Sequence, residues 1–117
     1  MNALALGSLV VDSRLNQKLK ARIELVSTQV DELVDARATL ANQAAFDQAG
    51  LKRPFILTSL RFEIVTKGTS NYILVSSKES LREPQLNFII EVAAPAGRIL
   101  REYTVLLRPT AADLDRY

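Results

Sequence analysis

The chain has 117 residues, the size of one domain, and its 48% apolar content is ordinary for a globular protein. Fifteen basic and 13 acidic residues leave a net charge of +2, and the basic residues are dispersed, which argues against a nucleic-acid partner. The chain contains no histidine and no cysteine, which excludes a Ser-His-Asp triad, thiolate metal sites and disulfides. No stretch approaches the ~20 apolar residues of a membrane span, so no direct membrane insertion is expected.

Two strands are predicted at the start of the chain. Residues 4–12 are apolar and then β-branched, and they end where short polar side chains favour a turn. Residues 18–25 alternate between apolar and charged side chains, which predicts a strand with one buried face and one wet face. The wet face carries Lys18, Lys20 and Arg22, and we treat these three cations as one candidate interaction surface.

Short elements of mixed type are predicted next. Residues 27–35 are ambiguous and have room for one capped helical turn. Residues 36–41 follow as a short strand with its apolar side chains in one phase. Asn42 offers a cap for a helix over residues 43–49, and Gly50 ends that helix. The small apolar stripe of the helix predicts that it packs as a lid on a sheet edge or end.

Four stronger strands occupy the rest of the chain. Each alternates apolar and polar residues, and turn-forming residues join the first pair and the last pair. About seven short strands without regularly alternating helices predict a mainly all-β fold, an antiparallel β-sandwich of the immunoglobulin-like kind with one short inserted helix. We expect residues 1–109 to form this single domain and residues 110–117 to form a polar, flexible tail. The four strands are expected at residues 60–64, 71–76, 86–93 and 98–107.

Residue types that carry catalysis elsewhere are not arranged for it in this chain. A Ser-Lys pair within Ser76, Ser77 and Lys78 is unfavourable, because adjacent residues of a strand point to opposite faces. The carboxylates fall on turns and on the tail, where surface charge is the simpler interpretation. The four glycines are too far apart for a phosphate-binding loop. No catalytic, cofactor-binding or metal-ligating residue is therefore assigned, and no cofactor is expected.

The Arg-Glu-Pro turn ahead of the third of these strands is the best candidate for a specific contact. Pro84 fixes its own backbone and holds Glu83 extended, so a simple turn before a strand is the competing interpretation. We group Arg82 and Glu83 with Arg98, which follows the next turn, as a second candidate interaction surface.

Arg101 is the charged side chain that shares a phase with the apolar residues of the last strand. An arginine in such a position is usually paired, so an ion pair with Glu83 or Glu91 is expected. Such a pair would be structural rather than an anchor for a ligand.

Several short sequence words, spread from about residue 6 to residue 109, occur in a specific order and spacing. The clearest are Leu-Asn-Gln at residues 15–17, Leu-Arg-Phe-Glu at 60–63, Arg-Glu-Pro at 82–84 and Arg-Glu-Tyr-Thr-Val-Leu-Leu at 101–107. Together these words resemble the N-terminal periplasmic domain of the FimV/HubP family of polar landmark proteins. The resemblance covers nearly the whole chain.

The sequence departs from the family pattern at Lys18, where proline is common, at Gln85, where an apolar residue is common, and at Arg108, where an acidic residue is common. Ala93 and Ala94 stand where an Asn-Trp pair usually precedes the turn, so no aromatic contact is transferred to that turn. The resemblance implies a periplasmic domain of an inner-membrane protein that supports type IV pilus assembly, twitching motility and cell-pole organisation. We expect the family's signal peptide, LysM module, membrane helix and acidic cytoplasmic region to lie outside this chain.

Three roles remain open on the sequence alone. The first is a non-enzymatic periplasmic interaction domain that binds through an exposed sheet edge or face. Its implied partners are periplasmic pilus-assembly proteins or peptidoglycan, with a weak homodimer as a further option. The second role is a structural spacer that positions a neighbouring LysM module. The third role, an enzyme such as a cell-wall hydrolase, is disfavoured because histidine and cysteine are absent.

Overall fold

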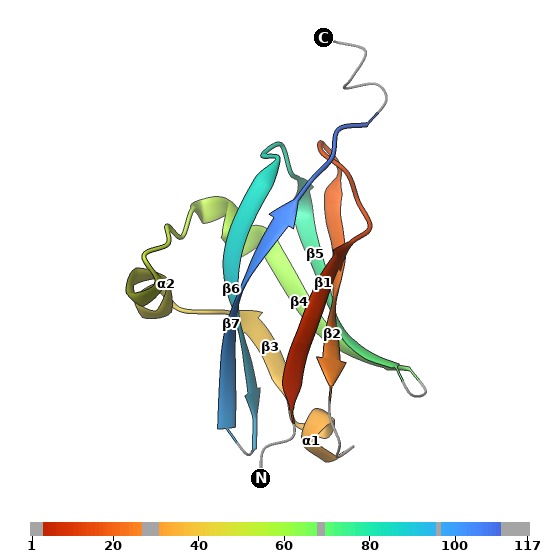
Figure 1. Cartoon of the computed structure of the whole chain (residues 1–117), viewed down its shortest axis with the longest axis vertical. Coiled ribbons are helices and arrows are strands. Elements are labelled where there is room, and N and C mark those ends of the chain that lie inside the picture. The colour runs from red at the N-terminus through yellow and green to blue at the C-terminus, as the bar shows by residue number, and fades with distance from the viewer. Residues whose placement is uncertain (1–3, 27–30, 68–69, 96, 111–117) are drawn as a thin grey trace.

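Two antiparallel sheets pack face to face in the computed structural model, which describes residues 4–26, 31–67, 70–95 and 97–110 (Figure 1). Sheet A has the order β1-β2-β5-β4, with β1 at Ala5–Val11, β2 at Lys18–Val26, β5 at Ser70–Ser80 and β4 at Leu60–Lys67. Sheet B has the order β3-β6-β7, with β3 at Arg37–Leu40, β6 at Gln85–Ala94 and β7 at Gly97–Leu106. The predicted mainly all-β, immunoglobulin-like sandwich is confirmed.

The core lies between the sheets and follows the alternation of the sequence. Every second residue of β2 is buried, while Lys18, Lys20 and Arg22 point outward, as predicted. The inner face of β6 supplies Phe88 and Ile90, which are fully buried. Burial of such side chains stabilises the fold by about 1.5–3 kcal/mol each. The largest fully buried side chains are Phe46, Phe88, Leu19, Ile23, Leu57, Ile73, Ile90, Val75, Val92 and Val105.

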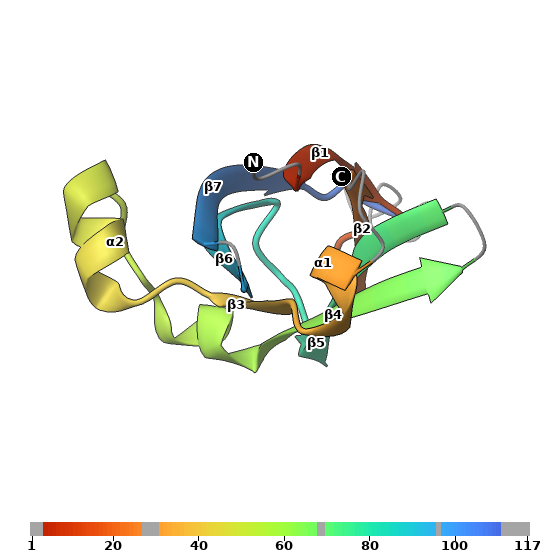
Figure 2. The same cartoon turned by 90° about the horizontal axis from the view of Figure 1, so that it is seen from below.

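Helix α2 (Gln43–Ala49) forms where its capping residues predict it. The Asn42 Oδ1 accepts a hydrogen bond from the Ala45 backbone N–H at 2.9 Å, and Gly50 ends the helix with a φ of 70°. The predicted position at a sheet edge or end is wrong, because α2 lies on the side of sheet B that faces away from sheet A (Figure 2). There it shields Ile89, an outward-facing residue of β6 that is only 5% exposed.

The two edges where the sheets meet differ in how they are closed. In Figure 2, β1 and β7 lie together along one edge, and β3 and β4 lie together along the other. At the β1–β7 edge the Tyr103 hydroxyl donates to the Gly7 carbonyl at 2.7 Å, and the Arg101 guanidinium donates to the Leu6 carbonyl. A bulge in β1 between Leu6 and Leu9 accompanies these contacts. The predicted ion pair of Arg101 is therefore wrong: this guanidinium bonds to a backbone carbonyl and lies 5.0 Å from the Tyr103 ring centroid.

Some elements differ from the sequence prediction. Strand β5 continues to Ser80 instead of ending at residue 76, and the 3-10 helix η1 (Phe55–Ser59) was not predicted. Helix α1 (Asp31–Val34) matches the expected helical turn, although most of the cap expected at residues 28–31 lies outside the described residues. Residues 111–117, most of the predicted tail, also lie outside them.

Candidate functional site

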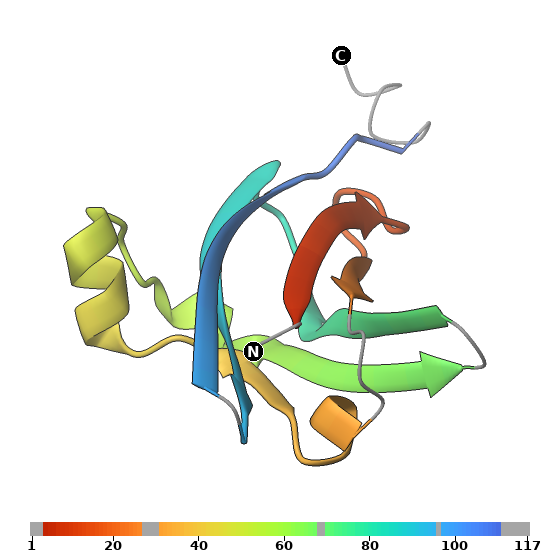
Figure 3. The ribbon, with the colours of Figure 1, turned by 60° about the horizontal axis from the view of Figure 1, so that its bottom comes forward.

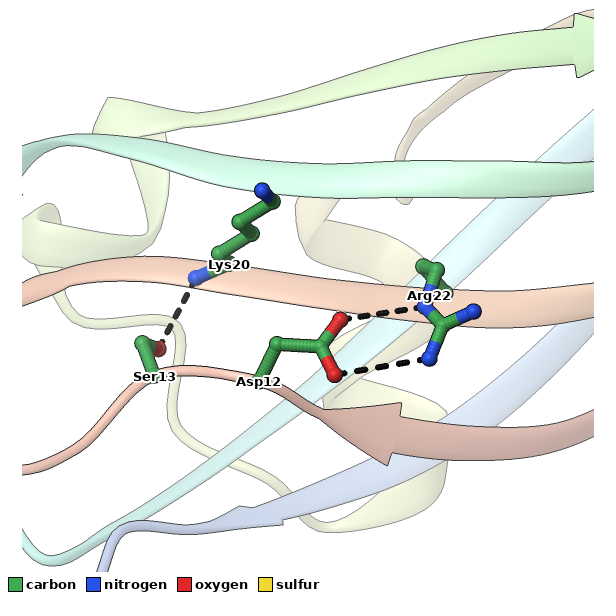
Figure 4. A network of polar contacts seen from close by, with 4 residues as sticks. All are labelled: Asp12, Ser13, Lys20 and Arg22. Atoms are coloured by element: carbon green, nitrogen blue, oxygen red, sulfur yellow. Dashed lines mark hydrogen bonds and ion pairs between the residues drawn. The ribbon is translucent and has the colours of Figure 1, made fainter.

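The three cations predicted on β2 project from the outer face of sheet A. Arg22 is compensated, because its Nε lies 3.0 Å from Oδ2 of Asp12 and its Nη2 lies 3.4 Å from Oδ1 (Figure 4). The Lys20 backbone N–H donates to Ser13 Oγ at 2.9 Å, while its side chain extends away from Ser13. Within the described part of the chain, no ion pair engages Lys18 or Lys20. These two lysines are the charges of this surface that remain open to a partner.

Cross-strand pairing adds a fourth cation to this face. Lys20 lies opposite Ser76 of β5, which in turn lies opposite Arg61 of β4. Residues directly opposite each other in adjacent strands share a face. Lys20 and Arg61 therefore project from the same face of sheet A, with Ser76 of β5 between them. The next row places Glu63 on the same face as Arg22. The positive end of sheet A is therefore the end that carries Lys18, Lys20 and Arg61.

The Arg-Glu-Pro turn before β6 is held in place by backbone hydrogen bonds at both ends. Leu81 exchanges backbone bonds of 3.0 and 2.7 Å with Gln17 and Asn16, and the Pro84 carbonyl accepts from the Leu107 N–H at 2.8 Å. The exposed Arg82 is thus presented by a fixed backbone, which reduces the entropy lost when a partner binds.

This turn forms one wall of a groove that we call the insertion groove, with a volume of about 1050 Å³. Its other wall is the segment between α2 and η1. Lys52 and Arg82 face it alongside Glu79 and Glu83, so its charges balance. The lining residues are Gly50, Leu51, Lys52, Pro54, Ile56, Glu79, Ser80, Arg82, Glu83, Gln85, Leu86 and Asn87.

Phe55 is the most exposed large apolar side chain in the described residues, at 88% of its surface. Its chain neighbours Pro54 and Ile56 line the insertion groove, so Phe55 lies between two lining residues without being part of the lining itself. A fixed segment presents it, since the Thr58 hydroxyl and the Leu57 backbone N–H both close the turn of η1. Exposed aromatic residues of this kind frequently anchor protein partners.

Arg98 lies far from the other members of its predicted surface. It is paired in register with Ala93, near the end of the ten-residue strand β6, whereas Arg82 and Glu83 precede the start of that strand. Ten residues of strand span about 33 Å. Arg98 instead forms an ion pair with the partly buried Glu91, with Nη1 and Oε1 3.6 Å apart. Glu91 is one of the two carboxylates that the sequence suggested as a partner for Arg101. Lys18, by contrast, is joined to the insertion groove, because it pairs with the lining residue Ser80.

Among the described residues, no group of three or more acidic residues gathers as a metal site would require. Burial raises the pKa of Tyr103, and the charge and hydrogen bond of the neighbouring Arg101 oppose that rise. No described helix is long and apolar enough to cross a membrane.

The strand order of the two antiparallel sheets defines an immunoglobulin-like β-sandwich domain. The profile of the family described as "FimV N-terminal domain Ig-like domain" matches residues 4–110, so the chain belongs to the FimV N-terminal domain family. It is 40% identical over 109 residues to the motility hub protein FimV of Pseudomonas aeruginosa strain PAO1, and equally to that of strain UCBPP-PA14. These matches cover 92% of this chain but only 12% of each relative. The comparison with solved structures found no match.

Proposed function

We propose that this chain is a non-enzymatic interaction domain that works in the periplasm and supports type IV pilus assembly, twitching motility and cell-pole organisation. The family membership supports the broad role, since its matched relatives are motility hub proteins. The observation that carries the proposal is Phe55, which is 88% exposed and lies in the chain between two residues that line the insertion groove. A spacer has no need of an exposed aromatic residue on a fixed segment, because exposed apolar surface carries an aggregation risk.

The groove suits a partner that offers both apolar and polar contacts. Leu51, Pro54 and Ile56 provide apolar lining next to Phe55. Arg82 and Glu83 provide one donor-rich and one acceptor group from the opposite wall. Because the lining charges balance, binding here is expected to persist at physiological salt, where exposed long-range attraction is screened.

The proposal is tested by co-sedimentation of the purified domain with intact sacculi and by pull-down of periplasmic pilus-assembly proteins, each at low and at physiological salt. Phe55→Ala is expected to weaken binding by about 30-fold, the effect of losing a hot-spot aromatic residue. The fold should survive, because the side chain is almost fully exposed. Leu100→Ala is the matched control, since Leu100 is 48% exposed near the other end of sheet B.

Three outcomes count against the proposal. Equal binding by the wild type and Phe55→Ala would exclude Phe55 and the insertion groove as the binding site. A double change of Lys18 and Lys20 to glutamine then tests the cationic face of β2, whose contribution should fall with salt. Absence of any binding by the wild type in both assays would favour the spacer role, and measurable turnover of sacculi would favour an enzyme.

A further inference from the structure

The β3–β4 edge of the sandwich carries a groove on its surface, although β3 and β4 lie close together there, as β1 and β7 do at the other edge. A groove of about 790 Å³ runs along it, within the range of volumes that ligands occupy. Figure 3 shows β3 and β4 passing close to one another on this side of the molecule. No hydrogen bond or ion pair links the two strands among the described residues, whereas Tyr103 and Arg101 bridge the opposite edge.

The backbone of β3 presents groups toward this groove that no other described strand pairs. Among the described residues, β3 pairs only with β6, so its second edge has no strand partner there. The Ala41 N–H donates to the Ile89 carbonyl of β6 at 2.9 Å. Backbone groups of successive strand residues point to alternate sides, so those of Leu40 and Ala38 point away from β6, toward the open edge.

The groove also reaches apolar side chains that belong to the core region. Ala38 from β3 and Phe62 and Ile64 from β4 line it and are only partly buried. A small side chain at Ala38 leaves room for larger side chains of an incoming segment. The rim has one cation and one anion, Arg37 and Glu63, so it favours neither charge sign.

We propose that the β3–β4 groove binds an extended peptide segment of a partner protein, which adds to β3 as a fourth strand of sheet B. Unpaired amides and carbonyls along a strand edge are matched by the backbone of another extended peptide. The apolar lining selects alternating apolar side chains, which insert between the sheets. The inference rests on the proposed role as an interaction domain, and it names a second site and the chemistry of its partner. Since β3 is four residues long, the segment that pairs with it is about that length.

Amide-resolved NMR on the whole chain tests the proposal with a synthetic probe. The probe is a peptide of alternating valine and threonine with a lysine at each end, and the control probe carries N-methyl groups on alternate amides. The unmethylated peptide is expected to shift the Ala38 and Leu40 amide signals and to slow their hydrogen exchange. The methylated peptide is expected to bind at least about tenfold more weakly, because it cannot complete the ladder.

A matched pair of variants gives the second readout. Ala38→Pro removes an N–H that faces the open edge, a position where proline is tolerated in edge strands. It is expected to weaken peptide binding by about tenfold or more, whereas Thr104→Ala, on the exposed face of β7 and outside the groove lining, should leave it unchanged.

Three results would overturn the inference: no change at Ala38 and Leu40 with millimolar peptide, equal binding of both peptides, or protection of these amides in the free chain that rises with protein concentration. The last result would identify a second copy as the occupant. If the peptide fails while binding that depends on Phe55 persists, the inference fails and the proposed function stands.

Discussion

Tyr103→Phe tests the closure of the β1–β7 edge with the removal of one oxygen atom. Tyr103 is 7% exposed, and its hydroxyl donates to the Gly7 carbonyl at 2.7 Å across the gap between the sheets. Phenylalanine keeps the ring, which packs against Phe88 with centroids 6.2 Å apart. The substitution therefore removes the hydrogen bond and leaves most of the apolar burial intact.

The expected cost follows from what the substitution leaves behind. A buried hydrogen bond contributes about 1 kcal/mol net, and an acceptor left without its donor costs about 1–3 kcal/mol when water cannot reach it. Gly7 is partly exposed, so water replaces part of the loss. We expect Tyr103→Phe to lower the free energy of unfolding by about 1–2 kcal/mol, and the melting temperature by about 5–10 °C for a domain of this size.

The difference between wild type and variant should also depend on pH. Burial raises the pKa of the Tyr103 hydroxyl above its ordinary value of 10.0, against the opposing effect of Arg101. Well below pH 10 the hydroxyl is neutral in both the folded and the unfolded chain, and its hydrogen bond contributes fully to the free energy of unfolding. As pH rises above 10, the unfolded chain loses this proton first, so the contribution is lost as pH rises through the folded pKa. Phenylalanine has no such proton, so Tyr103→Phe does not lose stability in this way. The difference in the free energy of unfolding between wild type and variant should therefore narrow at high pH.

Denaturant unfolding at pH 7 and at several values above pH 10 measures both effects. Thr104→Val is the control. Thr104 lies on the exposed face of β7, the strand of Tyr103, and its hydroxyl donates to Asn87 of β6, so the loss of this hydrogen bond should change the free energy of unfolding by no more than about 0.5 kcal/mol. Equal stability of Tyr103→Phe and wild type at pH 7, or a gap that widens at high pH, would refute the reasoning.

Three further substitutions test other parts of the fold by thermal or denaturant unfolding. Gly7→Ala should cost about 1–3 kcal/mol, because an added Cβ would lie 2.9 Å from Cβ of Glu24; a neutral result would mean that the bulge adjusts freely. Ser77→Ala should cost about 1–3 kcal/mol, because the buried Ser77 Oγ accepts from the Leu19 N–H at 2.8 Å; a stabilised variant would contradict this. Asn42→Ala should cost about 1 kcal/mol by removing the cap of α2, and an unchanged stability would show that the cap contributes nothing.

The fold was largely predictable because alternation controls burial in sheets. β2 alternates strictly between buried apolar and exposed residues, β6 and β7 do so with exceptions such as Ile89 and Arg101, and the bounds of all three fall close to the predicted ranges. The end of β5 was missed because residues 76–80 are polar. Ser77 nevertheless occupies a buried position there, since its hydroxyl accepts from Leu19 and donates to the Glu79 carbonyl. A polar run gives no hydrophobic signal for such a strand.

The candidate sites were only partly predictable, because they depend on contacts between distant segments. Arg82 and Glu83 were singled out by their turn, but their groove needs a wall some 30 residues earlier in the chain. Arg98 was grouped with them by proximity in sequence, although the length of β6 separates them. Phe55 was missed, because it begins a Phe-Ile-Leu run that resembles core sequence, and only the packing of η1 shows that Leu57 is buried and Phe55 is not.

The central claim is that this domain binds partners and does not merely space its neighbours apart. The most direct measurement replaces residues 4–110, within the full-length protein in its own host, with an unrelated immunoglobulin-like domain of the same size, and records twitching motility and polar localisation. An interaction domain predicts that twitching or localisation is lost while the level of the protein stays normal. Retention of both functions by the substituted protein would contradict the claim and assign the domain a spacer role.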